Sequence, residues 1–135
     1  MAGQKVCLDT TFLVDLLRNL KSAVDKAYQM RRDECEFYTT TINAFELYIG
    51  AYRSRKPKRV ADVEEILNDI VLLSINRNEA EESAKIFVEL MERGEIIDIR
   101  DALIAGVFWK MIAIILLLKM FAHFTSISGI NVLTY

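Results

Sequence analysis

The stretch that decides the fold reads KVCLDTTFLVDLLRNL and spans residues 5–20. Its first part, Lys5 to Leu8, is a short apolar run that ends at Asp9. The part from Phe12 to Leu20 then carries leucines at helical spacing, namely Leu13, Leu16, Leu17 and Leu20. These patterns predict a strand, a turn and a helix in direct succession. An acidic residue therefore stands at the carboxyl end of the first predicted strand.

The same alternation of strand and helix continues along the chain. We predict helices at residues 22–32, 43–51, 60–70, 78–93 and 102–109, and strands at 37–40, 71–75, 112–118 and 131–134. Gly94 is expected in the C-cap position of the fourth of these helices, and residues 53–59, which contain the only proline, are expected to be a loop. Strands that alternate with helices, some of them almost wholly apolar, predict an α/β fold with a mostly parallel sheet. No repeat or internal boundary is visible, so residues 1–135 are expected to form one domain.

Composition sets the broad class of protein. The chain has 135 residues, 53% of them hydrophobic, and a net charge of −2, which indicates a globular protein and argues against disorder or a coiled coil. The charge gives no overall attraction to nucleic acid, so any RNA binding must be local. Cys7 and Cys35 are too few for a disulfide framework and form no zinc motif. With no signal peptide visible, we expect a cytoplasmic protein.

One hydrophobic stretch, residues 102–122, approaches the length of a membrane span and carries only Lys110 and Lys119 as charges. Lys110 divides it into an Ala- and Gly-containing half that suits a helix and a half, residues 112–118, that suits a strand buried on both faces. A core helix followed by a core strand explains the stretch better than a membrane span.

Three acidic residues are candidates for chemistry, because ligand sites in open α/β sheets lie beyond the carboxyl ends of the strands. Asp9 and Asp101 each precede a predicted helix, and Glu46 lies in the first turns of another. If they converge, a divalent cation is needed to offset their repulsion, and oxygen ligands favour Mg²⁺ or Mn²⁺. Such a metal supports hydrolysis of a phosphodiester, with the number of metals left open. Equally, Asp9 and Asp101 could only cap helices, and Glu46 could face solvent.

Four short motifs carry a resemblance to a known family. The stretch VCLDTTFLVD (residues 6–15) resembles the opening strand and turn of PIN domains of the VapC toxin type. In the same order, TTINAFELYIG (residues 40–50) is similar to the second acidic motif of that family, and DALIA (residues 101–105) to the third. The closing segment is matched by His123, Phe124, Ile127, Gly129 and Val132.

This resemblance implies a PIN-like three-layer α/β/α sandwich and a metal-dependent endoribonuclease, the toxin of a toxin–antitoxin pair. It implies that Asp9, Glu46 and Asp101 are catalytic carboxylates that bind Mg²⁺ or Mn²⁺. Thr10 and Thr40 are then expected as hydroxyls beside these ligands. Independently of the resemblance, Asp98 and Asp15 are expected to lie at the surface or beside the site. The implied partners are an RNA substrate, a second copy of the chain in a homodimer and an antitoxin protein.

The chain departs from the family at one place. Family members commonly have Thr-x-Asn or Thr-x-Asp ahead of the His-Phe pair, where this chain has Leu118-Lys119-Met120. With Met120 in a usually polar position, metal binding could be weaker, could use Asp98 or a water, or could be lost. The alternative function is a catalytically degenerate PIN fold that acts as a binding or regulatory module. A receiver-like domain fits less well, since only isolated pieces of its pattern are present.

Two other features allow more than one interpretation. His123, the only histidine, could be a general base, but a lone His beside Phe124 more often packs and hydrogen-bonds locally. The basic residues between Arg53 and Arg59 could hold RNA phosphates. A solvated loop is the simpler interpretation, because no aromatic residues for base stacking follow Tyr52 in that run.

Overall fold

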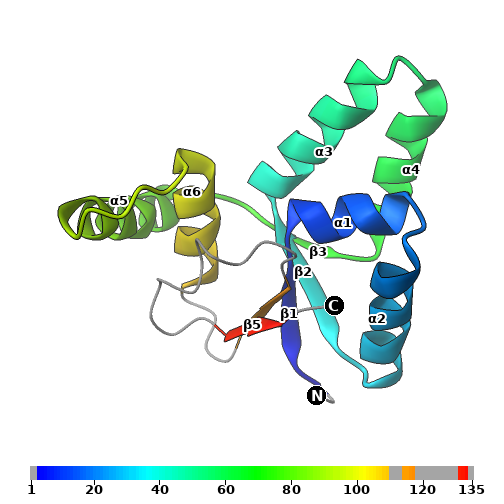
Figure 1. Cartoon of the computed structure of the whole chain (residues 1–135), viewed down its shortest axis with the longest axis horizontal. Helices are drawn as coiled ribbons and strands as arrows, with labels where there is room; N and C mark the ends of the chain where they lie inside the picture. The colour runs from blue at the N-terminus through cyan, green and yellow to red at the C-terminus, as the bar shows by residue number, and fades with distance from the viewer. Residues whose placement is uncertain (1–2, 110–113, 118–130, 134–135) are drawn as a thin grey trace.

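A parallel sheet forms the centre of the molecule. The computed structural model describes residues 3–109, 114–117 and 131–133. Its five strands lie in the order β3-β2-β1-β4-β5, and every neighbouring pair is parallel (Figure 1). The strands are β1 (Lys5–Leu8), β2 (Glu36–Thr40), β3 (Val71–Leu73), β4 (Ile114–Leu117) and β5 (Asn131–Leu133). Because all strands run the same way, their carboxyl ends meet at one edge, and the predicted mostly parallel sheet is confirmed.

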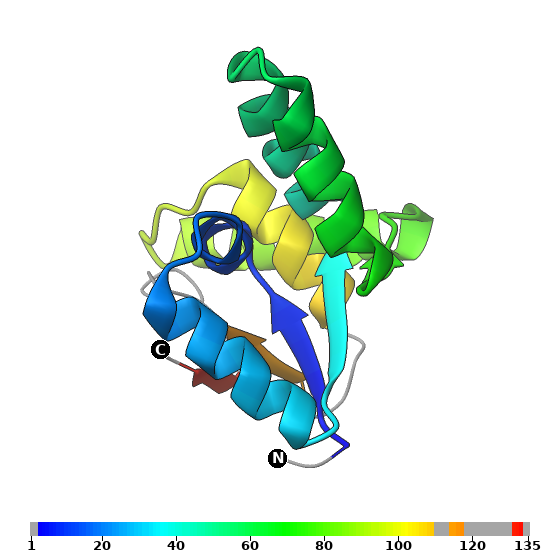
Figure 2. The ribbon, with the colours of Figure 1, turned by 90° about the vertical axis from the view of Figure 1, so that its right-hand side faces the viewer.

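Helices cover both faces of this sheet. The described residues form α1 (Thr10–Leu17), α2 (Lys21–Arg32), α3 (Thr41–Arg53), α4 (Pro57–Asn68), α5 (Arg77–Glu92) and α6 (Ile99–Phe108). Figure 1 shows α5 and α6 on one side of the strands and α1 and α2 on the other. Figure 2 shows the antiparallel pair α3 and α4 projecting beyond the carboxyl edge of the sheet. The three-layer α/β/α arrangement expected from the sequence is therefore confirmed.

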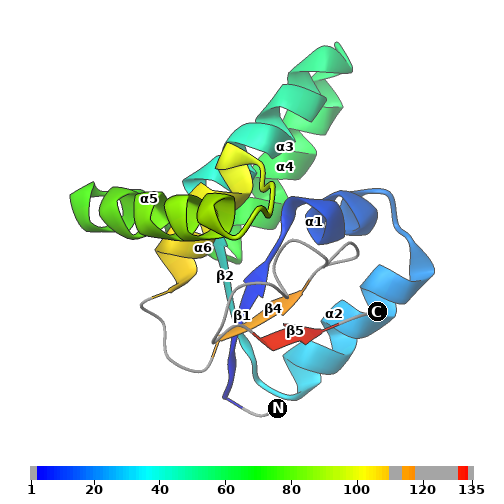
Figure 3. The same cartoon turned by 60° about the vertical axis from the view of Figure 1, so that its left-hand side comes forward.

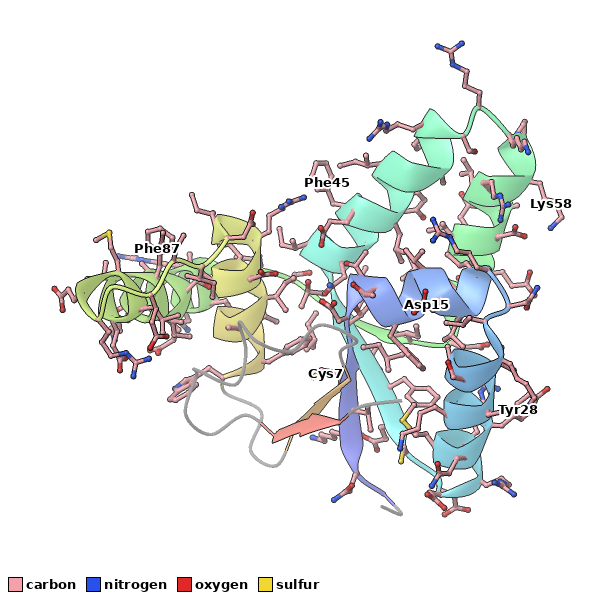
Figure 4. All side chains as sticks on the ribbon, viewed as in Figure 1. Cys7, Asp15, Tyr28, Phe45, Lys58 and Phe87 are labelled. Carbon is pink, nitrogen blue, oxygen red and sulfur yellow. The ribbon has the colours of Figure 1, made fainter. Side chains whose placement is uncertain are left out.

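Successive side chains of β1 pack into two separate hydrophobic cores, one on each face of the sheet. Val6 and Leu8 pack with Phe12, Met30 and other apolar residues of α1 to α4. Cys7 points to the opposite face, toward the core of α5 and α6 (Figure 4). Because Cys7 is fully buried, its pKa is raised, which suits a packing role for this thiol. The period-two pattern of a strand covered on both faces thus anchors both helical layers.

The boundaries of α1 differ from the sequence prediction at both ends. The helix begins at Thr10 rather than at Phe12, because Asp9 occupies the N-cap and its carboxylate accepts a hydrogen bond from the Thr11 backbone N–H at 3.4 Å. It ends at Leu17 rather than Leu20, since Asn19 has a φ of 56°, in the left-handed region that stops a helix.

The predicted loop at residues 53–59 is wrong in large part. Arg53 is the last residue of α3, and α4 starts at Pro57, so only residues 54–56 connect the two helices. The proline marks a helix start rather than a loop, because its fixed φ suits the first helical turn and it lacks a donor that would be unpaired there. Of the basic residues in this region, Arg53 therefore ends α3, Lys58 and Arg59 lie in the first turn of α4, and Arg55 and Lys56 lie in the connection.

The end of α5 follows the predicted glycine signal. Gly94 has a φ of 74°, its N–H donates to the Met91 carbonyl, and the Glu95 N–H donates to the Leu90 carbonyl. This is the pairing of a Schellman motif, for which glycine is favoured. The chain can therefore reverse and enter α6, which packs closely against α5 (Figure 3).

The hydrophobic stretch at residues 102–122 is divided in the way the sequence predicted, as far as the structure describes it. Its first half lies in α6, and β4 covers residues 114–117 of its second half. Among the described helices, none is long and apolar enough to cross a membrane. Met120, Lys119 and His123 lie outside the described residues.

Candidate functional site

Asp9 stands directly beyond the carboxyl end of β1 and is half-buried. Its pKa is raised to about 6, chiefly because burial disfavours the charged form, and the negative charges of Asp101 and Glu46 act in the same direction. Backbone N–H groups of Thr11 and Thr10 act the opposite way. Asp9 therefore caps α1, and its carboxylate is also close enough to Asp101 and Glu46 for their charges to affect its pKa. Its capping role and its predicted role in the functional site do not exclude each other.

Glu46 reaches the same edge from the second turn of α3. Thr10 donates its hydroxyl hydrogen bond to Glu46 Oε1 at 2.9 Å, and the Arg100 guanidinium lies 3.3 Å from Glu46 Oε2. The side chain of Glu46 is 23% exposed. It therefore points neither wholly into the core nor freely into solvent, and it is tied to residues far away in the sequence.

Asp101 approaches from the first turn of α6, with Asp98 close by. The sequence suggested Asp101 as an N-cap, but that is wrong: Asp98 is the N-cap, and its carboxylate accepts from the Arg100 backbone N–H at 2.8 Å. Because Asp98 takes the capping role, the carboxylate of Asp101 is not used for it. Its charge contributes to the raised pKa of Asp9, which places Asp101 within electrostatic range of β1.

The structure thus brings three predicted residues, Asp9, Glu46 and Asp101, to one electrostatic environment, which we call the acidic site. Thr10 lies in it as well, through its bond to Glu46. Thr40 is fully buried and is linked to it through Asn43. Asp98 lies at its rim. Asp15, expected near the surface or beside the site, is instead buried on α1 (Figure 4).

Asn43 organises this site, and the sequence analysis missed it. Its side-chain N–H donates to Thr10 Oγ1 at 3.0 Å and lies 3.5 Å from Asp9 Oδ1. Its carbonyl oxygen accepts from the backbone N–H and the hydroxyl of Thr40, at 3.2 and 2.7 Å. Thr40 and Asn43 form a capping box at the start of α3. The Thr-x-x-Asn spacing was the available signal, and it links the helix start to two strand ends.

Arg100 is a second residue that the sequence analysis missed. It lies 3.3 Å from both Glu46 and Asp98, and its side chain is half exposed. The hydrogen bond to Asp98, together with the charges of Asp98 and Glu46, raises the pKa of the guanidinium. Arg100 therefore supplies positive charge to one side of the acidic site.

The donors fit a hard divalent cation better than a soft one, since they are carboxylate oxygens. Among the residues that the structure describes, no three or more His, Cys, Asp or Glu side chains form a cage that could hold a metal ion. Mg²⁺ does not need such a cage, because proteins commonly hold it through one or two carboxylates while waters complete its shell. The raised pKa of Asp9 shows that its negative charge is unfavourable in this surrounding, and a cation would relieve that.

Comparison with known proteins decides the family. The sequence model of the PIN domain matches residues 6–108, from the second residue of β1 to the last residue of α6. The chain belongs to the PIN domain family. Asp9, Glu46 and Asp101 all fall within the matched part of this PIN domain. No curated protein is significantly similar to the chain in sequence.

Solved structures show that this PIN domain has the fold seen in VapBC complexes. A chain of VapBC2 from Rickettsia felis, bound to a DNA fragment from their promoter, superposes with a TM-score of 0.85 at 18% identity, covering 98% of this chain and 99% of that chain. DNA-bound VapBC from Salmonella typhimurium gives 0.83 at 22% identity, covering 97% and 98%. VapBC-1 from nontypeable Haemophilus influenzae gives 0.82 at 18%, covering 97% and 98%. At these identities the likeness concerns the fold.

Proposed function

We propose that this PIN domain is a metal-dependent endoribonuclease that hydrolyses RNA phosphodiesters and acts as the toxin of a toxin–antitoxin pair. The observation that carries the proposal is the convergence of Asp9, Glu46 and Asp101 at the carboxyl edge of the sheet, where Asp9 feels the charges of the other two. Membership of the PIN family supports a nuclease, and the likeness in fold to VapBC structures supports the toxin role.

Asp9, Glu46 and Asp101 would hold Mg²⁺ or Mn²⁺, which supplies an activated water and neutralises charge on the phosphate. The protein contributes orientation. Thr10 holds one oxygen of Glu46, and Asn43 is placed between Thr10 and Asp9 by its bonds to Thr40. Residues that hydrogen-bond to metal ligands fix the orientation of those ligands. These hydrogen bonds would therefore orient the carboxylates of Asp9 and Glu46 toward the same metal ion.

The direct test is RNA cleavage by the wild type and Asp9→Asn in saturating Mn²⁺. We expect the variant to lose more than about 100-fold in rate, since even residues behind metal ligands are worth roughly 10- to 100-fold. Asn retains the capping ability of Asp, so α1 should persist, which circular dichroism can check. Asp25→Asn, at an exposed residue paired with Lys21, is the matched control. Undiminished cleavage by Asp9→Asn would overturn the site assignment.

Two protein partners belong to the proposal. An antitoxin is supported by the VapBC complexes that share the fold. A homodimer is supported by four exposed apolar side chains in α5, in α6 and in the segment that joins them, namely Val88, Met91, Ile96 and Ile99, whose exposed fractions range from 43% to 94%. Exposed apolar surface on a small protein often marks an interface when it is contiguous. We expect a dimeric mass by light scattering and a monomeric one for Ile96→Glu; a monomeric wild type would contradict the homodimer.

A second function, a catalytically degenerate PIN fold that binds without cleaving, is favoured by the Arg100–Glu46 ion pair. This pair already neutralises one of the three carboxylates at 3.3 Å, so the acidic site has less need of a metal. If the folded wild type cleaves no RNA at saturating Mn²⁺, this second function replaces the first.

A further inference from the structure

A cavity of about 300 Å³ lies between α1, α3 and α4, beside the acidic site. Its apolar floor comes from all three helices and includes Leu17, Leu47 and Val63. Glu46 also lines it, so the cavity and the acidic site share a side chain. Its volume is at the lower end of the range for small-molecule sites. The cavity is therefore large enough for one part of a substrate whose reacting bond lies at the acidic site.

The charges around this cavity are unequally compensated. Of its two acids, Glu46 is paired with Arg100, and Asp62 is paired with Lys58, whose Nζ lies 3.3 Å away. Its two cations are Arg18 and Arg59. Among the residues that the structure describes, neither arginine has an ion pair or a side-chain hydrogen bond. The cavity, hereafter the arginine-lined cavity, therefore presents two uncompensated positive charges over an apolar floor.

The ligand that matches this combination has an apolar face and a neighbouring anion. We propose that the arginine-lined cavity binds the nucleotide adjacent to the scissile phosphate of single-stranded RNA, with the base against the apolar floor and its phosphate between Arg18 and Arg59. The inference rests on the proposed nuclease function. Guanidinium groups bind phosphate oxygens through charge-assisted, often paired hydrogen bonds. Since the net charge of the chain is −2, local cations of this kind are what would hold RNA.

Gly50 offers a steric test of the same cavity. It lines the cavity from α3, and a Cβ built on it meets nothing within 4 Å. Its φ is ordinary, so a side chain there introduces no backbone strain. Gly50→Leu should therefore leave the fold intact while it fills the space meant for the base. Gly50→Ala, which adds only a methyl group, is the matched control.

The charge test measures binding of a fluorescent, single-stranded oligoribonucleotide of mixed sequence in Ca²⁺, a hard cation that also takes carboxylate ligands. A gel confirms that the RNA stays whole. We expect the double variant Arg18→Gln/Arg59→Gln to bind roughly tenfold more weakly or worse, and the slope of log affinity against log salt to fall by about 0.7, the value for one lost phosphate contact. Arg77→Gln on α5 removes the same kind of exposed charge away from the cavity and should change neither.

The steric test uses the same probe. Gly50→Leu should weaken RNA binding by a similar factor with no loss in melting temperature, and Gly50→Ala should bind like the wild type. Mn²⁺ affinity, measured by calorimetry without RNA, should stay unchanged in all these variants, because none alters a carboxylate of the acidic site. Wild-type RNA affinity in both the double arginine variant and Gly50→Leu would overturn the proposal.

The experiments distinguish an error in the cavity assignment from an error in the proposed nuclease function. If the wild type cleaves RNA but neither set of cavity variants affects binding, only the cavity assignment is wrong. If the wild type neither binds nor cleaves RNA, the nuclease function falls and the cavity assignment with it. A glutamate-rich peptide serves as a second probe. If it binds through Arg18 and Arg59 while RNA binding ignores them, the cavity is a protein site and the RNA assignment is overturned.

Discussion

The acidic site and the arginine-lined cavity meet at Glu46 but are built in different ways. In the acidic site, Asn43 is completely buried and bonds to Thr10 and Thr40, so the carboxylates rest on a hydrogen-bonded support. In the cavity, Arg18 and Arg59 are exposed long side chains without such support. A rigid support suits groups that must hold one geometry, and flexible cations suit a ligand that varies in sequence. The difference therefore separates the residues expected to act in chemistry from those expected to act in binding.

The largest effect should come from breaking the rigid support. Asn43→Ala removes the partner of Thr10 and Asp9 and leaves the Thr40 hydroxyl without its acceptor, so we expect RNA cleavage to fall by roughly 10- to 100-fold. Stability should fall by about 1 to 3 kcal/mol, because buried polar groups lose their partners. Initial cleavage rates and urea unfolding measure both.

The matched control for Asn43→Ala is Asn76→Ala, at the N-cap of α5 and away from the acidic site. Loss of this cap should cost about 1 kcal/mol and leave cleavage at the wild-type rate. If both variants reduce cleavage equally, the effect of Asn43 is one of general stability and the proposed support has no specific role.

A smaller effect is expected from the charge of Asp9 in the metal-free protein. Its pKa is raised from an unfolded value near 3.8 to about 6, so the folded state holds the proton more tightly and ionisation destabilises the fold. Asp9→Asn should therefore stabilise the protein by up to about 3 kcal/mol above pH 6. That gain should fade as the pH falls from 6 toward 4. Urea unfolding in the presence of EDTA over this pH range measures it.

Asp9→Ala separates the charge of Asp9 from its capping role. Both variants remove the charge, but only Asn keeps the N-cap, so Asp9→Ala should be about 1 kcal/mol less stable than Asp9→Asn at every pH. A stability gain of Asp9→Asn that is the same at pH 4 and pH 8 would contradict the role of ionisation.

The smallest effect concerns Arg100, which pairs with Glu46 in the acidic site. Arg100 competes with a metal for Glu46, but the pair is partly exposed and such pairs contribute little. We expect Arg100→Gln to raise Mn²⁺ affinity by roughly two- to fivefold, measured by calorimetry, with Arg93→Gln on the end of α5 as control. A weaker Mn²⁺ affinity in Arg100→Gln would mean that Arg100 supports the metal site instead of opposing it.

The two regions also differ in how far the sequence could predict them. The order of strands and helices follows from apolar periodicity, and Asp9 is conspicuous because it ends an apolar strand. The start of α4 was missed, since Pro57 inside a basic run resembles a loop unless its preference for a first helical turn is weighed. Asn43 was missed because its function depends on side chains of two strand ends meeting, which no local pattern encodes.

The cations were harder still to predict. Arg18 and Arg59 are far apart in the sequence, and only the packing of α1 against α3 and α4 places both around one cavity. Arg100 reaches Glu46 across 54 residues. A count of charges along the chain cannot tell which arginines are paired in three dimensions. The sequence could therefore suggest the acids that would act in chemistry, while the positive charges around them required the structure.

The most direct test of the central claim is a calorimetric titration of Mn²⁺ into the wild type, Asp9→Asn and Asp101→Asn at matched pH and ionic strength. Asp9 follows β1 and Asp101 lies in the first turn of α6, so they can affect one ion only if they converge. We expect one class of binding event in the wild type and a loss of most of its affinity in both variants. If the wild type binds no Mn²⁺, or if either variant binds it as the wild type does, Asp9 and Asp101 do not share a metal site.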